Sequence, residues 1–232
     1  MMKALLTLLL ALAFGAASYF FPFSGYTADQ LPIPQTDPPI QPATWAFAIW
    51  GVIFTWLVVS AVYGLWKRSD DAMWEAVRTP LILALLVGTP WNWVANQSPI
   101  WATVMILAMA GFAIAALLRS TPKDRWLLSA PLGLFAGWLT AAGFVSLAAT
   151  MAGYGLLTDA TGWAYIGIAA AAVLAFAVQS RTHEWTYGLA VAWALSAIIV
   201  KNWPGLPMVA AAAGVALLLI AARAATKARA PA

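Results

Sequence analysis

The chain has 232 residues, of which 63% are hydrophobic and only 9% are charged, whereas a soluble globular domain carries about 25% charged residues. This composition predicts an integral membrane protein. The twelve basic residues stand mostly singly between apolar runs, so the net charge of +4 does not indicate a nucleic-acid partner. The absence of cysteine and the single histidine, His183, exclude disulfides, thiolate metal sites and multi-histidine metal or haem sites.

The first apolar run extends from Ala4 to Phe21 behind a single basic residue, Lys3. A short basic start followed by a leucine-rich run and small residues also fits a cleaved signal peptide. The run stays apolar through residues 19–21, which favours a first membrane span that is retained in the mature protein.

A proline-rich loop over residues 22–43 follows, and its only charged residues are Asp29 and Asp37. Closely spaced prolines prevent helix formation and stiffen the chain. A loop of this length is either a surface linker or a lid over a site, and both interpretations stay open at this point.

Seven more apolar runs follow, at about residues 44–66, 79–97, 100–118, 127–153, 162–179, 185–201 and 206–223. A membrane-spanning helix needs about 20 apolar residues. Of the twelve Lys and Arg residues, all but Lys201 fall on one side of the alternation, which the positive-inside rule assigns to the cytoplasm. We therefore predict an all-α bundle of about eight transmembrane helices in a bacterial inner membrane, with both termini cytoplasmic and the proline-rich loop outside.

The second run, Pro42 to Trp66, is dense in aromatic residues that fall on two opposite helix faces at 100° per residue. One face holds Phe47, Trp50 and Phe54, and the other holds Trp45, Trp56 and Tyr63. Interfacial belts explain most of the fourteen tryptophans. The exceptions lie within the hydrocarbon depth, where an indole N–H needs a partner: Trp50, Trp56, Trp138 and Trp193.

The third run contains Pro90, which removes a helical hydrogen bond and predicts a kink. Trp91 and Asn92 follow directly, and Asn96 lies one turn further on. Polar residues at membrane depth usually face the protein interior. Asn92 is therefore either a hydrogen-bonding link between two helices or a polar group inside a cavity.

The fifth run repeats small residues at four-residue spacing, Gly133, Gly137 and Ala141, which predicts a groove for close helix packing. An adjacent face is expected to oppose the aromatic face of the second run, and it holds Phe135, Trp138, Ala142 and Ser146.

The last three runs are plainer, and Lys201 near the end of the seventh is expected to extend into the lipid headgroups. No charged residue lies in the middle of any run, which argues against a proton-coupled transporter. No phosphate loop, nucleophile motif or metal-ligand spacing is present, so an enzyme and a metal site are the least favoured readings.

The pattern Pro42-x-x-Trp45-x-Phe47-x-x-Trp50-x-x-x-Phe54 resembles the second-helix signature of the TspO/MBR family. These are the tryptophan-rich sensory proteins related to the mitochondrial translocator protein, also called the peripheral benzodiazepine receptor. The family usually has Tyr at position 54 and Pro at position 48. The resemblance covers about residues 1–157, and residues 158–232 resemble the three additional helices and basic tail of a longer bacterial branch.

Two further segments are similar to the later helices of this family. The third run, with Trp91 and Asn92, resembles its Asn/Trp segment at an altered spacing, and the fifth run resembles its final helix through Gly137-Trp138. Ser146 stands where the family has Asn, which removes one expected polar contact.

The resemblance implies a five-helix bundle with a pocket beneath the loop after the first helix. It predicts a membrane sensor or binding protein for a flat hydrophobic ligand such as a tetrapyrrole, held between the second, third and fifth helices, with no required cofactor. The expected ligand-binding residues are Trp45, Phe47, Trp50, Phe54, Trp91, Asn92, Phe135, Trp138, Ala142 and Ser146.

Three alternatives remain open from the sequence. The protein could export or transport a small amphipathic molecule, or act as a membrane scaffold or assembly factor that binds another membrane protein or a second copy of itself. The third alternative, which the resemblance implies, is an enzyme that breaks down a tetrapyrrole by a light-driven or oxidative reaction. The lipid bilayer is an expected partner in every case.

Overall fold

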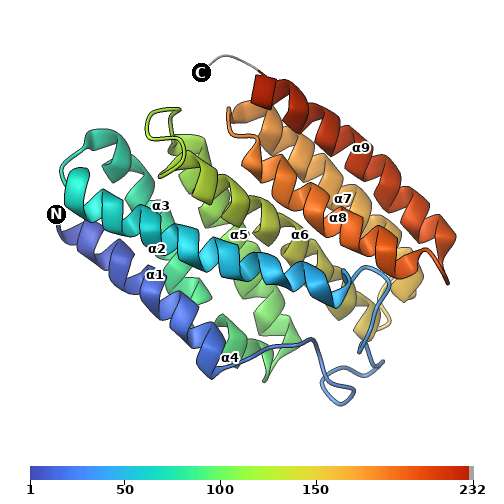
Figure 1. Cartoon of the computed structure of the whole chain (residues 1–232). Coiled ribbons are helices and arrows are strands. Elements are labelled where there is room, and N and C mark those ends of the chain that lie inside the picture. Colours follow the sequence, from blue (N-terminus) through green and yellow to red (C-terminus); the bar gives the residue numbers. More distant parts are fainter. Residues whose placement is uncertain (230–232) are drawn as a thin grey trace.

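The computed structural model describes residues 1–229, and all regular structure within them is helical (Figure 1). In chain order the elements are α1 (Met2–Phe20), the 3-10 helix η1 (Thr44–Ala48), α2 (Ile49–Lys67), α3 (Ala72–Gly88), α4 (Trp91–Ala95), α5 (Pro99–Arg119), α6 (Ser129–Gly153), α7 (Ala160–Arg181), α8 (Thr186–Asn202) and α9 (Pro207–Arg229).

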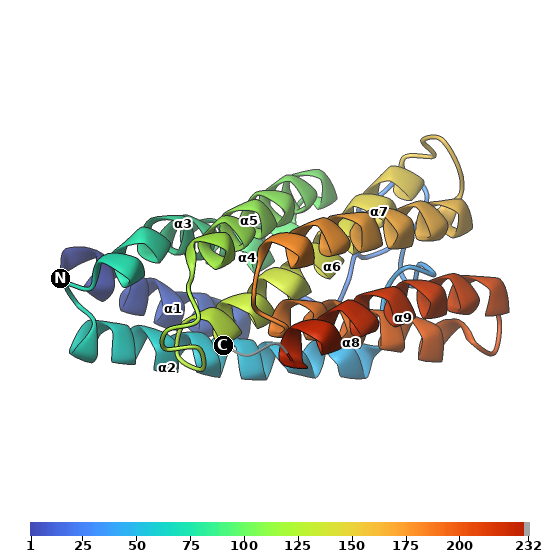
Figure 2. The same ribbon diagram turned by 90° about the horizontal axis from the view of Figure 1, so that it is seen from above.

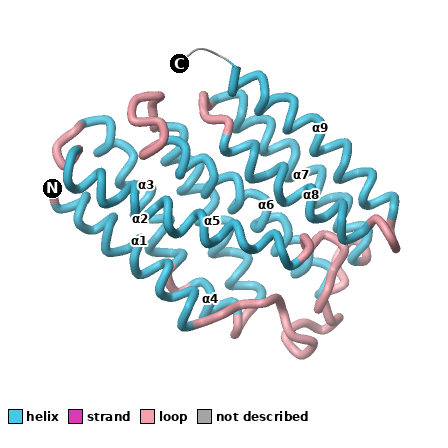
Figure 3. Tube along the Cα trace, in the orientation of Figure 1, coloured by secondary structure: helices cyan, strands magenta, loops and turns pink. Residues whose placement is uncertain are grey.

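The long helices lie side by side and connect through short turns at alternate ends (Figure 1). One end carries the N-terminus together with residues 68–71, 120–128 and 182–185, and we call it the termini end. The other end carries the loop of residues 21–43, called the long loop below, which Figure 3 shows as the most extended connection. The long loop therefore lies at the opposite end of the bundle from the N-terminus and the end of α9.

Among the described residues, six helices are long and apolar enough to cross a membrane: α1, η1 with α2, α5, α6, α7 and α9. Helix α8 is apolar but has only 17 residues. Helix α3 also has 17 residues, and it carries Glu75 and Arg78 in its first half. The predicted all-α membrane bundle is confirmed. Six of the eight predicted apolar runs correspond to one helix each, whereas the second run contains η1 and α2 and the third contains α3 and α4.

The third predicted run is divided into two helices. Helix α3 begins at Ala72, earlier than the expected residue 79, because the Asp71 carboxylate accepts hydrogen bonds from the backbone N–H groups of Met73 and Trp74 and caps the helix. The helix ends at Gly88, and α4 starts directly after Pro90, which cannot continue the hydrogen-bonding ladder. The kink expected at Pro90 is thus a complete break.

Helix α6 lies at the centre of the bundle, between the layer that holds α3 and α5 and the group α7 to α9 (Figure 2). Its small residues explain this position. A Cβ atom at Gly137 would lie 2.2 Å from the carbonyl oxygen of Tyr187 and 2.9 Å from the Cβ of Ala190, so α8 approaches α6 at backbone distance. The close-packing groove predicted from the glycine spacing is confirmed, and its occupant is α8.

The second aromatic face of α2 contacts the loop before α6. The indole N–H of Trp56 donates to the carbonyl oxygen of Trp126 at 2.7 Å, and the two rings are stacked. The Tyr63 hydroxyl donates to Asp124 at 3.5 Å. The partner that Trp56 requires within the membrane is therefore a backbone carbonyl of the chain itself.

Candidate ligand cavity

A cavity of about 340 Å³ lies beneath the long loop, among helices α1, α2, α4, α5 and α6, with single lining residues from η1 and α8. Small-molecule sites typically occupy about 300–1,000 Å³ and are mostly apolar, with a few polar groups. Most of the lining here is aromatic or aliphatic, and none of the described lining residues is charged. The space therefore suits a small hydrophobic ligand.

This cavity is lined by most of the residues that were predicted for the site. They are Phe47, Trp50, Phe54, Trp91, Asn92, Trp138, Ala142 and Ser146. They converge from η1, α2, α4 and α6, so the helical faces identified from periodicity do meet around one space.

Two predicted residues lie outside the lining. Trp45 is 44% exposed, and its ring packs edge-on against Trp193 of α8 at 4.9 Å, because it projects from the opposite side of η1 to Phe47. Phe135 is fully buried and packs against the ring of Phe14 at 5.8 Å, one helical turn nearer the termini end than Trp138. Both residues pack in the protein rather than at the cavity surface.

Helices α1 and α5 complete the walls, although the sequence did not point to them. Phe14 and Ser18 of α1, one turn apart, and Ile106 and Met109 of α5 line the cavity. Phe14 packs edge-on against Phe54 at 5.1 Å. The only signal in the sequence was the i, i+4 spacing of Phe14 and Ser18 within a uniformly apolar run.

The aromatic side chains form a corner. Trp50 and Phe54 are stacked, with ring centroids 5.1 Å apart and planes 15° apart. The Trp138 ring is nearly perpendicular to Trp50, at 6.1 Å and 86°, and also to Phe47, at 5.8 Å. Such a corner offers apolar surfaces at right angles to one another.

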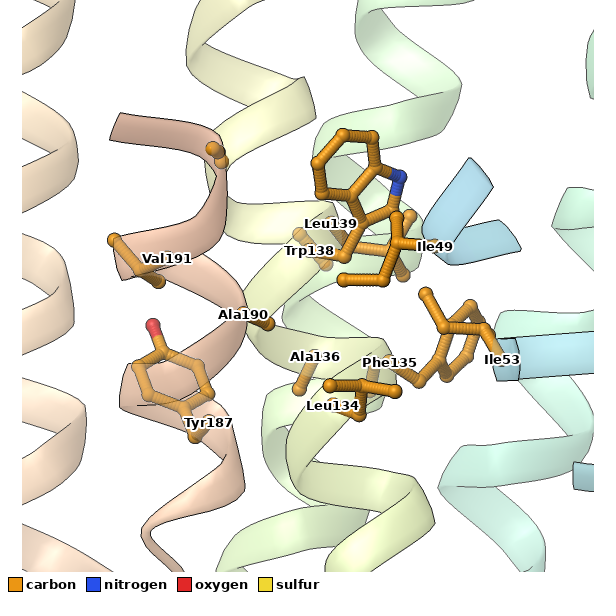
Figure 4. Close-up of a cluster of buried hydrophobic side chains, with 14 of the residues drawn as sticks. Ile49, Ile53, Leu134, Phe135, Ala136, Trp138, Leu139, Tyr187, Ala190 and Val191 are labelled. Atoms are coloured by element: carbon orange, nitrogen blue, oxygen red, sulfur yellow. The ribbon is translucent and has the colours of Figure 1, made fainter. Parts of the chain in front are cut away.

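Trp138 carries a hydrogen-bond donor without a protein acceptor. The side chain is 1% exposed, and its indole nitrogen has no partner among the described residues. Figure 4 shows this nitrogen on the side of α6 that faces Ile49, whereas Tyr187 and Ala190 lie on the other side. A buried unpaired N–H costs about 1–3 kcal/mol, so an acceptor on a ligand would relieve a real penalty.

A family model described as TSPO-like protein matches residues 1–226. The chain belongs to this TSPO-like family. No curated protein and no solved structure matches the chain. The match continues through α7 and α8 and into α9, past residue 157, where the resemblance noted from the second, third and fifth runs ends.

In this TSPO-like chain the long loop covers the cavity. Its first part contributes Pro22, Phe23 and Tyr26 to the lining, and its last part contributes Gln41 and Pro42. The loop is held by its own hydrophobic side chains and by backbone hydrogen bonds, so it is a cover over the site and not a plain surface linker.

A chain of buried hydroxyl groups fixes the first part of the cover to the bundle. The hydroxyls of Tyr26 and Ser146 lie 2.8 Å apart, those of Ser146 and Thr103 2.7 Å, and those of Thr103 and Thr150 2.8 Å. Ser146 therefore serves the TSPO-like chain as an anchor for the loop at the edge of the cavity.

The surroundings of two polar residues bear on the expectations from the sequence. Asn92 makes no side-chain hydrogen bond to another helix among the described residues and lines the cavity, which favours its interpretation as a polar group facing a ligand. Lys201 does not extend into the headgroups as expected. Its ammonium group donates to the carbonyl oxygen of Pro38 at 2.8 Å, because the long loop folds over the end of α8.

Proposed function

We propose that this protein is a membrane sensor or binding protein for a flat hydrophobic ligand that carries a hydrogen-bond acceptor, with a tetrapyrrole such as protoporphyrin as the first candidate. The observation that carries the proposal is a mostly apolar cavity walled by aromatic rings, one of which, Trp138, has a buried indole N–H without a partner among the described residues. Aromatic faces bind planar apolar molecules through dispersion, and one convergent donor fixes their orientation.

The roles of the residues follow from their positions. The exposed faces of the Trp50–Phe54 stack and the perpendicular Trp138 ring hold the ligand body. The Trp138 N–H and the amides of Asn92 and Gln41 bind its polar substituents. Asn92 and Gln41 belong to α4 and the long loop, so the polar edge of the ligand is directed toward the loop end.

We place the protein in a bacterial inner membrane with both termini in the cytoplasm. Supporting this orientation, the N-terminus and the loops richest in Lys and Arg share the termini end, including the loops of residues 68–71 and 120–128. The cavity and its cover then open toward the outside of the cell.

The test is a titration of protoporphyrin into the purified full chain in detergent, followed by tryptophan fluorescence quenching. The double variant Trp50→Ala, Trp138→Ala should lose saturable quenching. The matched control is Trp66→Ala, since Trp66 is 74% exposed at the termini end of α2, far from the cavity. Equal saturable quenching in the wild type and the double variant would overturn this site.

The same protein preparation separates the alternative functions. Accumulation of ligand inside proteoliposomes would indicate a transporter instead of a sensor. A stoichiometric protein partner that copurifies while no ligand binds would indicate a scaffold. Conversion of the bound tetrapyrrole to a new absorbing product, in light or with an oxidant, would indicate an enzyme.

A further inference from the structure

The loop end of α8 holds two consecutive carbonyl groups of the long loop. The Lys201 ammonium donates to the carbonyl oxygen of Pro38 at 2.8 Å and also pairs with the carboxylate of Asp37. The Asn202 amide donates to the carbonyl oxygen of Pro39 at 2.8 Å. These contacts join segments 163 residues apart, and we call Lys201 and Asn202 the latch.

This arrangement covers most of the Lys201 side chain and buries Asn202. The Lys201 side chain is only 17% exposed and Asn202 is 5% exposed. A lysine that served only to reach the headgroups would keep its ammonium group in water. The carbonyl oxygen of Pro38 also accepts from the backbone N–H of Gln41 at 2.9 Å, whereas the carbonyl oxygen of Pro39 accepts from Asn202 of α8.

Helix α7 receives the next residue of the loop. Ile40 is 2% exposed, and its Cδ1 atom would lie 2.2 Å from a Cβ atom placed on Gly167. An alanine at this position would therefore require the end of the Ile40 side chain to shift. The contact is apolar, so it anchors the same part of the loop by a means independent of the latch.

Helix α8, which carries the latch, also forms part of the cavity wall. Ala194 of α8 lines the cavity, and its neighbour Trp193 donates to the carbonyl oxygen of Ala46 at 2.9 Å. The backbone N–H of Ala43 donates to the carbonyl oxygen of Ala197 at 3.3 Å. The junction between the long loop and η1 is therefore attached to α8 along two helical turns.

We propose that α8 controls access to the cavity: Lys201 and Asn202 are positioning residues that hold the last part of the long loop closed and thereby set the rate at which a hydrophobic ligand enters and leaves. The inference rests on the proposed function, because it concerns ligand exchange at that cavity. Gln41 and Pro42, which line the cavity, follow directly after the latched segment. Release of the latch would move them away from the bound ligand.

The test is stopped-flow measurement of protoporphyrin binding to and release from the purified full chain. Lys201→Met keeps the length of the side chain and removes its charge and donors. Together with Asn202→Ala it should raise the release rate about tenfold or more, since hydrogen bonds of charged donors are among the stronger ones in proteins. The association rate should rise as well, so that the equilibrium affinity changes less than either rate.

Three further variants complete the experiment: the first two are controls, and the third is a second test of the closed loop. Lys201→Arg keeps a charged donor and should preserve slow exchange. Lys67→Met removes a lysine at the termini end and should change neither rate. Gly167→Ala leaves the latch residues intact and displaces Ile40, so it should also accelerate exchange. Unchanged rates in Lys201→Met with Asn202→Ala, in a variant that elutes as a folded monodisperse protein, would overturn the inference.

Hydrogen–deuterium exchange of the ligand-free protein separates this inference from the proposed function. If the backbone amides of Ile40, Gln41 and Ala43 exchange faster in Lys201→Met than in the wild type, Lys201 holds this part of the loop closed. This result would stand even if protoporphyrin failed to bind the wild type. In that case the ligand assignment would be wrong and the latch correct. Unchanged amide exchange would reject the latch whatever the ligand does.

Discussion

The hydroxyl groups of Tyr26 and Ser146 lie 2.8 Å apart, although 120 residues separate them in the chain. This contact ties the long loop to α6 directly above the cavity, and Ser146 passes the hydrogen bonding on to Thr103. The cover is therefore attached at its first part to α6 and at its last part to α7 and α8.

The first prediction concerns this attachment. Tyr26→Phe keeps the ring, which is 8% exposed, and removes only the hydroxyl. The loss of one buried hydrogen bond should lower the free energy of unfolding by about 1 kcal/mol. Thermal unfolding in detergent measures this, with Tyr19→Phe as the control because Tyr19 is 83% exposed. Equal midpoints for the two variants would contradict the role given to the hydroxyl.

The second prediction compares the buried Trp138 with Trp193, which is 38% exposed. Trp138→Phe removes an N–H that has no acceptor, whereas Trp193→Phe removes one that donates to the Ala46 carbonyl. In the ligand-free protein Trp193→Phe should lose about 1 kcal/mol more stability than Trp138→Phe.

The two variants should rank the other way round when their affinity for protoporphyrin is measured. Trp138→Phe should weaken binding about tenfold, because the ligand acceptor loses its donor, and Trp193→Phe should leave affinity nearly unchanged. If Trp138→Phe binds as tightly as the wild type, the indole N–H does not contact the ligand.

The third prediction tests the close packing of α6 against α8 by replacing glycine with alanine at two positions, one inside this contact and one outside it. Gly137→Ala should destabilise the bundle by about 1–3 kcal/mol, because the new Cβ would overlap the carbonyl oxygen of Tyr187. Gly111→Ala on α5 meets nothing within 4 Å and should stabilise by about 0.5–1 kcal/mol through helix propensity. A stability increase at both sites, measured by thermal unfolding, would be incompatible with the observed packing.

The fourth prediction concerns acid stability at the termini end. Asp124 accepts hydrogen bonds from the Nε of Arg68 at 2.7 Å and the indole of Trp74 at 3.0 Å. The hydrogen bond from Arg68 is the main cause that lowers the pKa of Asp124 below its ordinary value of 3.8. Since the folded pKa lies below the unfolded one, this carboxylate stabilises the protein above pH 3.8 and loses its effect as pH falls through the folded pKa.

The measurement for this prediction is the stability difference between the wild type and Asp124→Asn as a function of pH. The variant should be less stable at pH 7, and the difference should shrink on acidification below about pH 4. Asp70→Asn is the control, because the Asp70 side chain is 85% exposed. A difference that stays constant down to pH 2 would show that the charge of Asp124 does not matter.

Local sequence patterns predicted part of the site well. Trp50 and Phe54 lie on one face of α2, as the 100° rotation per residue predicts, and Phe47 joins them from the preceding 3-10 helix η1. The glycine repeat of α6 likewise marked a close approach, because only small side chains allow two backbones to come together. Such features need no knowledge of the neighbouring helix.

Other parts of the cavity could not be found in this way. Helices α1 and α5 are apolar on all sides, since lipid and protein interior both favour apolar side chains, and so their sequences do not reveal which face turns inward. Phe14 and Met109 became wall residues only through the packing of α1 and α5 beside α2 and α6.

The sequence by itself determined the membrane environment, the helical runs, an irregularity at Pro90 and the aromatic face of α2, because composition and helical period act locally. Only the tertiary structure decided that the long loop is a cover and that Lys201 binds Pro38. An isolated lysine at the end of an apolar helix has lipid headgroups, water and protein carbonyls as alternative partners. The choice among them depends on where a segment 163 residues away in the chain comes to lie.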